Sequence, residues 1–549
     1  MEVFNLFIYS AIILIVFYLF YSARLKKKRA QKKIYLEKQW GKQKATDYYN
    51  FDAIAKYFLR RKSKDEAFHT LSSREIEDLD LHEVFKYINR TRSKIGEQYL
   101  YNRLLNIPTK EDRAAFILDQ EFFANQEECI EIQSVLERLS HPKIYQLEEL
   151  INGEQIKKPK YYPIIVLSTL TVLASLILAP KFPILLFLLI PSYLVNLFFH
   201  YSNKSNLNIY MGAFGQLFSV YKIAKKLQSF SSVQQLQKDL QFLKTLRNLK
   251  LKSRFLDDGQ LMNNEFGIAF WVILEQFKIL FNYETLIFIN LLDDLNKKHK
   301  DLDDLFNFIG SIDLHISLQS LKAGEPKTCI PEFHASKAIQ TKHVYHPLLE
   351  TPITNNLSLQ AKSLLLTGSN MSGKTTFIRT IALNLVLGQT LNLCFAESFN
   401  APYARLYTAI RISDDILSKT SYFKEEVNQL DHFIKMSRSS SPAIFVLDEI
   451  FKGTNTKERI ASAYGVLKYI NTPKHIVLVS THDTELTELL ANQNYDLYYF
   501  SENINQNQLT FDYKIKKGQL ENGNAIKILE LNNFPSEIIQ DAHHQLTEQ

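Results

Sequence analysis

The sequence predicts a mainly α-helical region that carries three transmembrane helices, followed by an α/β domain with a doubly wound sheet. Three observations lead to this fold class. Pro and Gly are scarce between Arg24 and about Ala335, so long helices can run unbroken there. Three apolar runs of bilayer length precede His200: one at 4–20 and two within the tract 161–199. From about His346 onward, short apolar strands alternate with helices, which is typical of a doubly wound sheet.

Length and charge set the first limits. The 549 residues exceed one hydrophobic core, and roughly three folding units are typical of such a chain. The net charge of +7 is unevenly distributed, since Arg24 to Lys33 holds seven cations and no anion. This block most simply fixes membrane orientation; contact with acidic headgroups or nucleic acid is the alternative. The three cysteines, Cys129, Cys329 and Cys394, favour neither a disulfide framework nor a metal site, and suit a reducing cytosol.

The first apolar run, Phe4 to Phe20, is uncharged and is followed at once by the cationic block. A cleaved secretory signal has the opposite order, with its cations before the apolar run. The run therefore predicts an uncleaved anchor with its N-terminus outside and Arg24 onward in the cytoplasm.

A second apolar tract, Tyr161 to Phe199, is interrupted by Pro180 and Pro183. Its halves, 162–179 and 183–199, each hold about 17 to 18 residues, nearly all apolar, which is just enough to cross a bilayer. Flanking cations place both ends on the cytoplasmic side: Lys157, Lys158, Lys160 and Lys204. We expect a transmembrane hairpin, and a buried helical pair in a soluble core is the alternative.

The third apolar region, Phe266 to Leu292, is interrupted by Glu275, Lys278 and Glu284. A charge at the bilayer centre costs about 2.5–3.5 kcal/mol on insertion scales. A further span here would also place everything downstream of it outside the cell. We therefore expect a buried or membrane-apposed helix.

A phosphate-binding loop is the strongest chemical signal. Leu364 to Leu366 predicts a buried strand, a helix-period run begins near Ile378, and Gly368 to Thr375 between them fits G-x-x-x-x-G-K-[ST] at every fixed position. Successive backbone N–H groups and the helix N-terminus would cradle phosphates. Lys374 would contact the terminal phosphates, and the Thr375 hydroxyl would ligate Mg²⁺.

Two later strands end in polar residues. Ala443 to Leu447 runs into Asp448 and Glu449, and His475 to Ser480 runs into Thr481-His482-Asp483. Asp448 can support Mg²⁺, and Glu449 can orient and deprotonate the attacking water. His482 can sense the γ-phosphate or that water, although a lone His is more often structural.

These segments together resemble the MutS family of mismatch-repair ATPases. The matching stretches are T-G-S-N-M-S-G-K-T-T-F-I-R-T around the loop, L-D-E-I-F-K-G-T-N-T-K-E-R-I-A from Leu447, V-S-T-H-D-T-E-L from Val479, the segment Arg411 to Val427, and His346-Pro347-Leu348-Leu349-Glu350. Weaker likeness extends to Leu79–Leu81, Gly96 and Ile312–Leu314 in the helical region.

The resemblance implies an ABC-type ATPase domain that uses ATP and Mg²⁺ and pairs with its twin as a homodimer that binds DNA. It implies Glu449, Lys374, Ser421 and His482 as catalytic residues, with Ser421 reaching the nucleotide of the partner subunit. It implies Thr375 and Asp448 at the metal. The implied nucleotide-binding set is Gly368, Ser369, Asn370, Met371, Ser372, Gly373, Lys374, Thr375 and Thr376.

The sequence departs from the family in ways that limit the expected function. Arg24 to Glu77 shows no resemblance to the mismatch-reading domain and contains no Phe-x-Glu wedge. Ser372 replaces a usual glycine, Lys452 replaces a usual arginine, and the Ser421 segment is loosely kept. ATP hydrolysis therefore carries over, whereas mismatch recognition does not.

The expected protein is a membrane-anchored MutS-like ATPase in the inner (cytoplasmic) membrane, acting as a nucleotide-driven clamp on DNA. A membrane-remodelling or transport-linked ATPase and an ATP-locked scaffold are the alternatives. The expected division is 1–33 (anchor and basic block), 34–77 (helical linker), 78–160 (first part of the helical core), 161–200 (transmembrane hairpin), 201–345 (lever and second part of the core), 346–524 (ATPase domain) and 525–549 (C-terminal helical dimerisation segment).

Overall fold

The computed structural model divides the chain into two compact units, each built from several segments. The helical unit comprises Met1–Lys62, Asn89–Asn102 and Phe116–Gly324, and the sheet unit comprises Ser63–Ile88, Arg103–Ala115 and Glu325–Gln549. The structure describes residues 2–45, 48–61, 67–153, 160–236, 238–247, 274–325, 327–369, 371–411, 422–451, 454–505, 508–520, 526, 529–530, 532 and 534–547.

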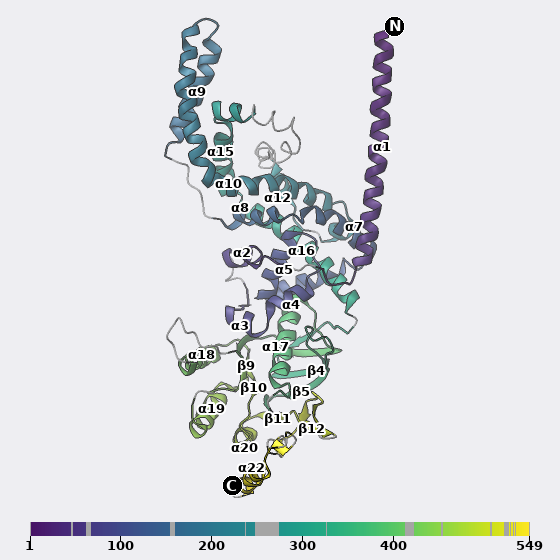
Figure 1. The fold of residues 1–549 in the computed structure, drawn as a ribbon, viewed down its shortest axis with the longest axis vertical. Helices are drawn as coiled ribbons and strands as arrows, with labels where there is room; N and C mark the ends of the chain where they lie inside the picture. Colours follow the sequence, from purple (N-terminus) through teal and green to yellow (C-terminus); the bar gives the residue numbers. More distant parts are fainter. Residues whose placement is uncertain are drawn as a thin grey trace. The chain divides into compact units, whose positions relative to one another are not determined.

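Helices build the first unit, as its scarcity of Pro and Gly predicts (Figure 1). Those lying wholly or mostly in it are α1 (Glu2–Gln39), α2 (Phe51–Arg60), α5 (Lys94–Leu105), α6 (Lys110–Glu121), α7 (Gln126–Leu136), η2 (Glu137–Leu139), η3 (Pro142–Leu147), α8 (Glu148–Asn152), α9 (Tyr162–Leu178), η4 (Pro183–Leu188), α10 (Leu189–Leu227), α11 (Ser231–Gln235), α12 (Gln241–Thr245), α15 (Tyr283–Lys297) and α16 (His299–Gly324).

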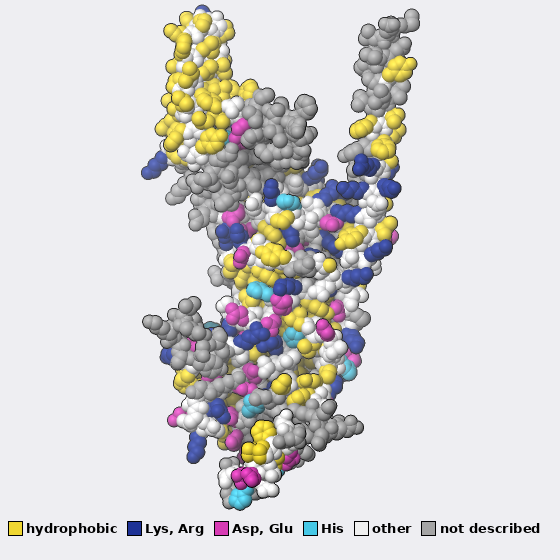
Figure 2. Space-filling view, viewed as in Figure 1, with side chains coloured by type: hydrophobic (Ala, Val, Ile, Leu, Met, Phe, Trp, Pro, Cys, Tyr) yellow, Lys and Arg dark blue, Asp and Glu magenta, His cyan; other side chains and the backbone are white. Residues whose placement is uncertain are grey.

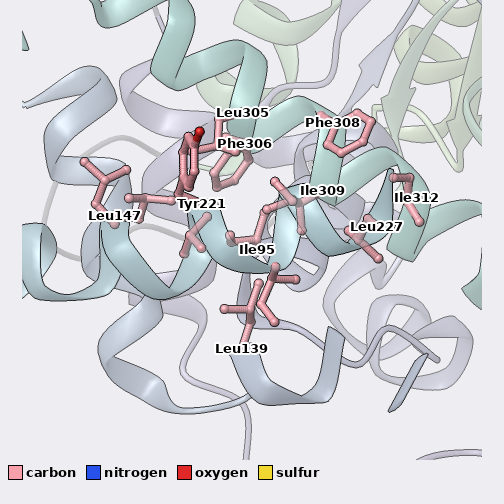
Figure 3. Close-up of a cluster of buried hydrophobic side chains, with 14 of the residues drawn as sticks. Ile95, Leu139, Leu147, Tyr221, Leu227, Leu305, Phe306, Phe308, Ile309 and Ile312 are labelled. Atoms are coloured by element: carbon pink, nitrogen blue, oxygen red, sulfur yellow. The ribbon is translucent and has the colours of Figure 1, made fainter. Parts of the chain in front are cut away.

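Helix α16 forms the centre of this unit because most of its side chains are buried. Figure 3 shows Leu305, Phe306, Ile309 and Ile312 of this helix within one apolar cluster. The cluster also includes residues of α5, α7, η3, α10 and α12. Burial of this apolar surface is the main favourable term that holds the helices together.

A buried carboxylate fixes the start of α5 against α16. Asp313 accepts hydrogen bonds from Ser93 N at 2.7 Å, Ser93 Oγ at 2.6 Å and Arg92 N at 2.9 Å. A Cβ on Gly96 would lie 2.2 Å from the Asp313 carboxylate, so the close approach requires glycine. Burial nevertheless raises the pKa of Asp313, since desolvation outweighs these bonds.

The expected hairpin forms from α9, η4 and α10, and α9 packs against α10. Large apolar side chains along it are exposed, among them Leu167, Ile177, Ile184 and Phe187 at 66%, 73%, 74% and 73%. Figure 2 shows this apolar surface covering the upper part of α9 and its neighbour. An exposed apolar surface of this extent is unusual for a protein in water.

The expectation of three membrane-spanning helices is met only in part. Among the described residues, one stretch, Pro183–Ser202 with 20 residues, is long and apolar enough to cross a membrane by length and composition. Helix α9 is shorter, at 17 residues. The run Phe4 to Phe20 lies within α1, but most of its side chains are outside the described set.

The described part of the third apolar region, residues 274–292, buries its charges. Glu275, Lys278 and Glu284 are all less than 10% exposed. The His200 Nε2 atom lies 3.2 Å from the Glu275 carboxylate, and Lys278 pairs with Glu284. The charges that argue against a span are thus paired inside the unit, as burial of charge requires.

The second unit is built on a six-stranded sheet in the order β14-β11-β6-β10-β9-β8. Its strands are β6 (Ser363–Thr367), β8 (Arg405–Ala409), β9 (Ala443–Asp448), β10 (Ile476–Ser480), β11 (Tyr495–Tyr499) and β14 (Lys516–Lys517). A four-stranded sheet contains β3 (Glu332–His334), β4 (Ala338–Val344), β5 (Asn355–Gln360) and β7 (Ser398–Pro402). Two small antiparallel pairs are β1 (His69–Thr70) with β2 (Asn106–Ile107), and β12 (Glu502–Asn505) with β13 (Gln508–Phe511).

Helices cover both faces of the larger sheet, which is the expected arrangement for a parallel sheet buried on both sides. Helices α18 (Tyr422–Ser437), α19 (Thr456–Ile470) and α20 (Glu485–Ala491) share one apolar cluster with its strands. Helix α17 (Lys374–Leu391) contacts β9 and β10 without joining that cluster, so it lies on the opposite face. The remaining helices are α3 (Ser73–Asp78), α4 (Leu81–Ile88) and α22 (Ser536–Thr547).

Candidate active site

Three neighbouring parallel strands bring the predicted site residues together. Strand β10 pairs in parallel with both β6 and β9, with Ser480 opposite Leu366 and Asp448. Because the carboxyl ends of parallel strands meet at one edge of the sheet, the loop after β6 lies beside Asp448 and His482. This edge is where ligands bind in open α/β sheets.

The loop after β6 has the backbone that a phosphate cradle needs. Gly368 has φ +147° and Gly373 has φ +102°, conformations that side-chain-bearing residues rarely adopt. A Cβ on Gly368 would lie 2.8 Å from the carbonyl oxygen of Phe500, the residue after β11, so the loop closely approaches the end of that strand. Gly373 is the N-cap of α17, whose N-terminus therefore opens toward the loop.

Lys374 lies inside this loop and is only 4% exposed. Its Nζ donates hydrogen bonds to the carbonyl oxygens of Gly368 and Ser369, each at 2.9 Å. The same Nζ lies 3.2 Å from His482 Nε2. A buried ammonium group surrounded by the backbone of a glycine loop is suited to binding anionic phosphates.

The two predicted metal ligands are in contact. The Thr375 hydroxyl donates to Asp448 Oδ2 at 2.8 Å, and the Ser480 hydroxyl donates to Asp448 Oδ1. Within the described residues, no group of three or more His, Cys, Asp or Glu side chains is arranged around a metal position. A hydroxyl and one carboxylate fit Mg²⁺, which keeps waters and substrate phosphates as its other ligands.

The predicted base and the histidine form a pair. His482 Nε2 lies 2.6 Å from Glu449 Oε1. Glu449 has φ +51°, a backbone conformation that costs energy for a residue other than glycine and that clusters at functional sites. Its backbone N–H donates to the Ser480 carbonyl at 2.9 Å, which holds the turn against β10. The carboxyl end of β9 and the turn that follows it thus fix the positions of Asp448 and Glu449.

A cavity of about 530 Å³ is lined by the loop residues 369 and 371–376 and by Glu449. It is also lined by His346, Leu349, Ile353, Phe377 and Tyr513, whose apolar and aromatic surface suits a flat aromatic base. Burial lowers the pKa of His346 to about 4, so this ring is neutral at pH 7.

Other predicted residues have mixed outcomes. Asn370 and Ser421 lie outside the described residues, as does Lys452. Met371 is 84% exposed. The buried Ser372 hydroxyl has no hydrogen-bond partner among the described residues, which leaves it available to a ligand. Thr376 lines the cavity, and Ser369 donates to the Glu502 carboxylate. The catalytic and binding roles assigned to all these residues stay predictions.

Sequence reasoning missed two parts of the site. Tyr513 and Ile353 line the cavity but belong to no recognisable motif. Asp80, at φ +50°, accepts hydrogen bonds from Arg379 of α17 at 3.0 Å and from Arg411 at 2.9 Å. One carboxylate thus connects the helix after the phosphate loop with Arg411, the first residue of the segment that contains Ser421.

This geometry agrees with the comparison to known families. Residues 364–549 match the family model described as MutS domain V. A MutS domain V is therefore present. Mouse and human proteins named MutS protein homolog 4 are 32% and 31% identical to the chain over 235 and 234 residues, which is 40% of the chain in each case. The DNA mismatch repair protein MSH3 of Coccidioides immitis (strain RS) is 26% identical over 277 residues, or 48% of the chain.

The matches cover only part of each protein. They span 24%, 25% and 24% of the lengths of the mouse, human and fungal relatives. The chain therefore spans about a quarter of the length of the curated relatives it matches. The similarity to MutS proteins is established for the C-terminal part of the chain, where the phosphate loop and both carboxylates lie.

Proposed function

We propose that the chain is a Mg²⁺-dependent ATP hydrolase of the MutS type. The observation that supports this most directly is the cluster at one sheet edge: a glycine loop with a buried Lys374, the Thr375–Asp448 contact and the Glu449–His482 pair. A MutS domain V match over the same residues supports it independently.

The chain's own groups divide the chemistry among them. The loop N–H groups and Lys374 hold the phosphates and offset their charge. The cavity wall around His346 and Tyr513 holds the base. Glu449 orients a water and accepts its proton, and His482 keeps the Glu449 carboxylate aimed at that position. Bound Mg²⁺ would supply charge stabilisation at the phosphates, held through Thr375 and Asp448.

ATP binding by the full-length chain tests the site. Lys374→Ala removes the buried ammonium, and we expect loss of measurable binding in a filter or fluorescence assay. Lys474→Ala removes an exposed cation of the same unit and is the matched control. Retention of normal affinity by Lys374→Ala would refute the assignment of the loop.

We further propose that the helical unit is anchored in the cytoplasmic membrane with the sheet unit in the cytoplasm and the N-terminus outside. Support comes from the exposed apolar hairpin and from Pro183–Ser202, which is long enough to span. A cysteine at Lys181, in a chain without its native cysteines, should react with an impermeant thiol reagent in intact cells. A cysteine at Lys474 should not, and the reverse pattern would contradict this topology.

Dimer formation through the sheet unit and DNA binding are the finer parts of the proposal. The fungal relative is named a DNA mismatch repair protein, which motivates them. Because the sequence shows no mismatch-reading element, we expect salt-sensitive binding through phosphates with little mismatch preference. Titration with matched, mismatched and four-way DNA at several salt concentrations tests this. Tenfold preference for a mismatch would contradict it, and absence of binding would favour a membrane-remodelling ATPase.

A further inference from the structure

The foot of α1 forms a pocket against other parts of the helical unit. Residues of α1 between Lys28 and Lys33 pack beside α7, η2 and the end of α10, and a cavity of about 550 Å³ lies among them. Five cations line it: Lys28, Lys32 and Lys33 from α1, Arg138 from η2 and Lys226 from α10. Figure 2 shows Lys and Arg side chains gathered over this part of α1.

Three acids lie beside the cations of α1. Lys32 lies 2.8 Å from Glu137, and Lys33 lies 3.3 Å from Glu131 and 4.0 Å from Glu127. Among the described residues that line the cavity, five are cations and Glu131 is the one acid. The lining therefore carries an excess of positive charge contributed by three separate elements, which a solvated face on one helix does not explain.

The pocket also has an apolar wall and a defined place along α1. Val135 and Phe230 line it beside the cations. Lys28 follows Arg24, the first charged residue after the apolar run, by four positions, which is about 6 Å along a helix. If α1 crosses a bilayer, the pocket begins just beyond the interface, within reach of a protruding headgroup.

We propose that this pocket binds the phosphate-bearing headgroup of an anionic phospholipid. The inference rests on the proposed membrane anchoring only for its source of lipid. A concave site of this volume with an apolar wall matches a headgroup and its glycerol, whereas duplex DNA is bound along an extended basic stripe. The bound lipid would join α1, η2 and α10 and so fix the anchor helix to the rest of the unit.

Two sets of substitutions with the same change of charge test the proposal. The first, Lys28→Gln with Arg138→Gln and Lys226→Gln, removes three cations of the pocket. The second, Lys26→Gln with Lys27→Gln and Lys222→Gln, removes three exposed cations of the same two helices, α1 and α10, that do not line it. The probe is short-chain phosphatidylglycerol, titrated into the full-length chain in neutral detergent and followed by native mass spectrometry.

We expect the pocket set to weaken binding on the order of 100-fold, because each of the three cations near an anionic headgroup contributes about a fivefold factor. We expect the control set to change affinity less than about threefold, and Lys28→Arg with Lys226→Arg to retain binding. Native helix content by circular dichroism and an unchanged thermal-unfolding midpoint for both sets show that the helical unit folds.

Equal weakening by both sets would show diffuse attraction and overturn the pocket. So would inorganic phosphate that binds as tightly as the lipid, or a short duplex DNA that displaces it. Because the assay is performed in detergent, it does not depend on membrane insertion. Recovery of the native chain from carbonate-washed membranes tests the anchoring separately.

Discussion

The phosphate-loop edge of the sheet unit and the hairpin of the helical unit differ in how they encode structure. At the edge, fixed residues at fixed spacing determine geometry: Gly368 and Gly373 have positive φ angles that other residues rarely adopt, and Asp448 accepts a hydrogen bond from the Thr375 hydroxyl. In the hairpin, the overall apolar composition determines the structure, and we expect other apolar residues to be able to replace exposed side chains such as Leu167 and Phe187. A function that depends on a motif can therefore be predicted from single residues, whereas an apolar helical hairpin can be predicted only from the composition of a whole stretch.

The two regions should differ most when an arginine replaces an exposed apolar residue. Leu170 is 55% exposed near the middle of α9, and Leu489 is 46% exposed on α20. Leu170→Arg should reduce the membrane-inserted fraction roughly 100-fold, since a central charge costs about 2.5–3.5 kcal/mol on insertion. Leu489→Arg should change stability by less than about 0.5 kcal/mol. Carbonate extraction and thermal unfolding measure the two effects, and equal tolerance would show that lipid does not surround the hairpin.

A smaller effect is expected at the metal position. Asp448→Asn removes the negative charge of the carboxylate that accepts hydrogen bonds from the Thr375 and Ser480 hydroxyls. We expect it to lower Mg²⁺-dependent ATP turnover about 10–100-fold. Asp496→Asn alters another strand carboxylate, at the amino end of β11, where it pairs with Lys362. Its turnover should stay near normal. Similar losses from both would mean that Asp448 acts through the sheet and not through the metal.

The smallest effect concerns pH and the sheet unit. Burial lowers the pKa of His346 and of His69 to about 4, from an ordinary value of 6.5. Between pH 6.5 and 4 the unfolded chain binds these protons and the folded chain does not. Stability should therefore fall with pH in this window by about 1.4 kcal/mol per pH unit for each histidine. Thermal unfolding at pH 7, 6 and 5 should show a shallower dependence of stability on pH for His346→Gln than for the exposed control His544→Gln. An unchanged pH dependence would contradict this.

The sequence was sufficient to predict the parallel strands and the meeting of their carboxyl ends. A strand, a glycine loop and a helix in direct succession leave the backbone little conformational freedom. Lys374 and Thr375 therefore lie at the start of the helix, beside the loop, as the sequence predicts. Asp448 and Glu449 follow because a buried apolar run ends directly before them. The helical nature of the first unit also follows from composition, since few residues there interrupt helices.

The remainder depends on contacts between residues far apart in the chain. The pairing of His200 with Glu275 joins positions 75 residues apart, and no local pattern reveals it. Tyr513 reaches the cavity from a strand end without a motif, and Asp80 reaches Arg379 from a short turn. Three spans were expected from hydropathy alone, but helix α9 ends after 17 residues, and composition does not fix such an end.

The most direct test of the account is the turnover of ATP by Glu449→Gln. The amide keeps the size and the partner of the carboxylate but cannot accept a proton from water. We predict that steady-state hydrolysis by the full-length chain falls by about 10²–10⁴-fold, the range for a general base, while ATP affinity stays within about threefold. Glu488→Gln, an exposed acid on α20, should hydrolyse ATP at the native rate. Native turnover by Glu449→Gln would contradict the assignment of this sheet edge as a hydrolytic centre.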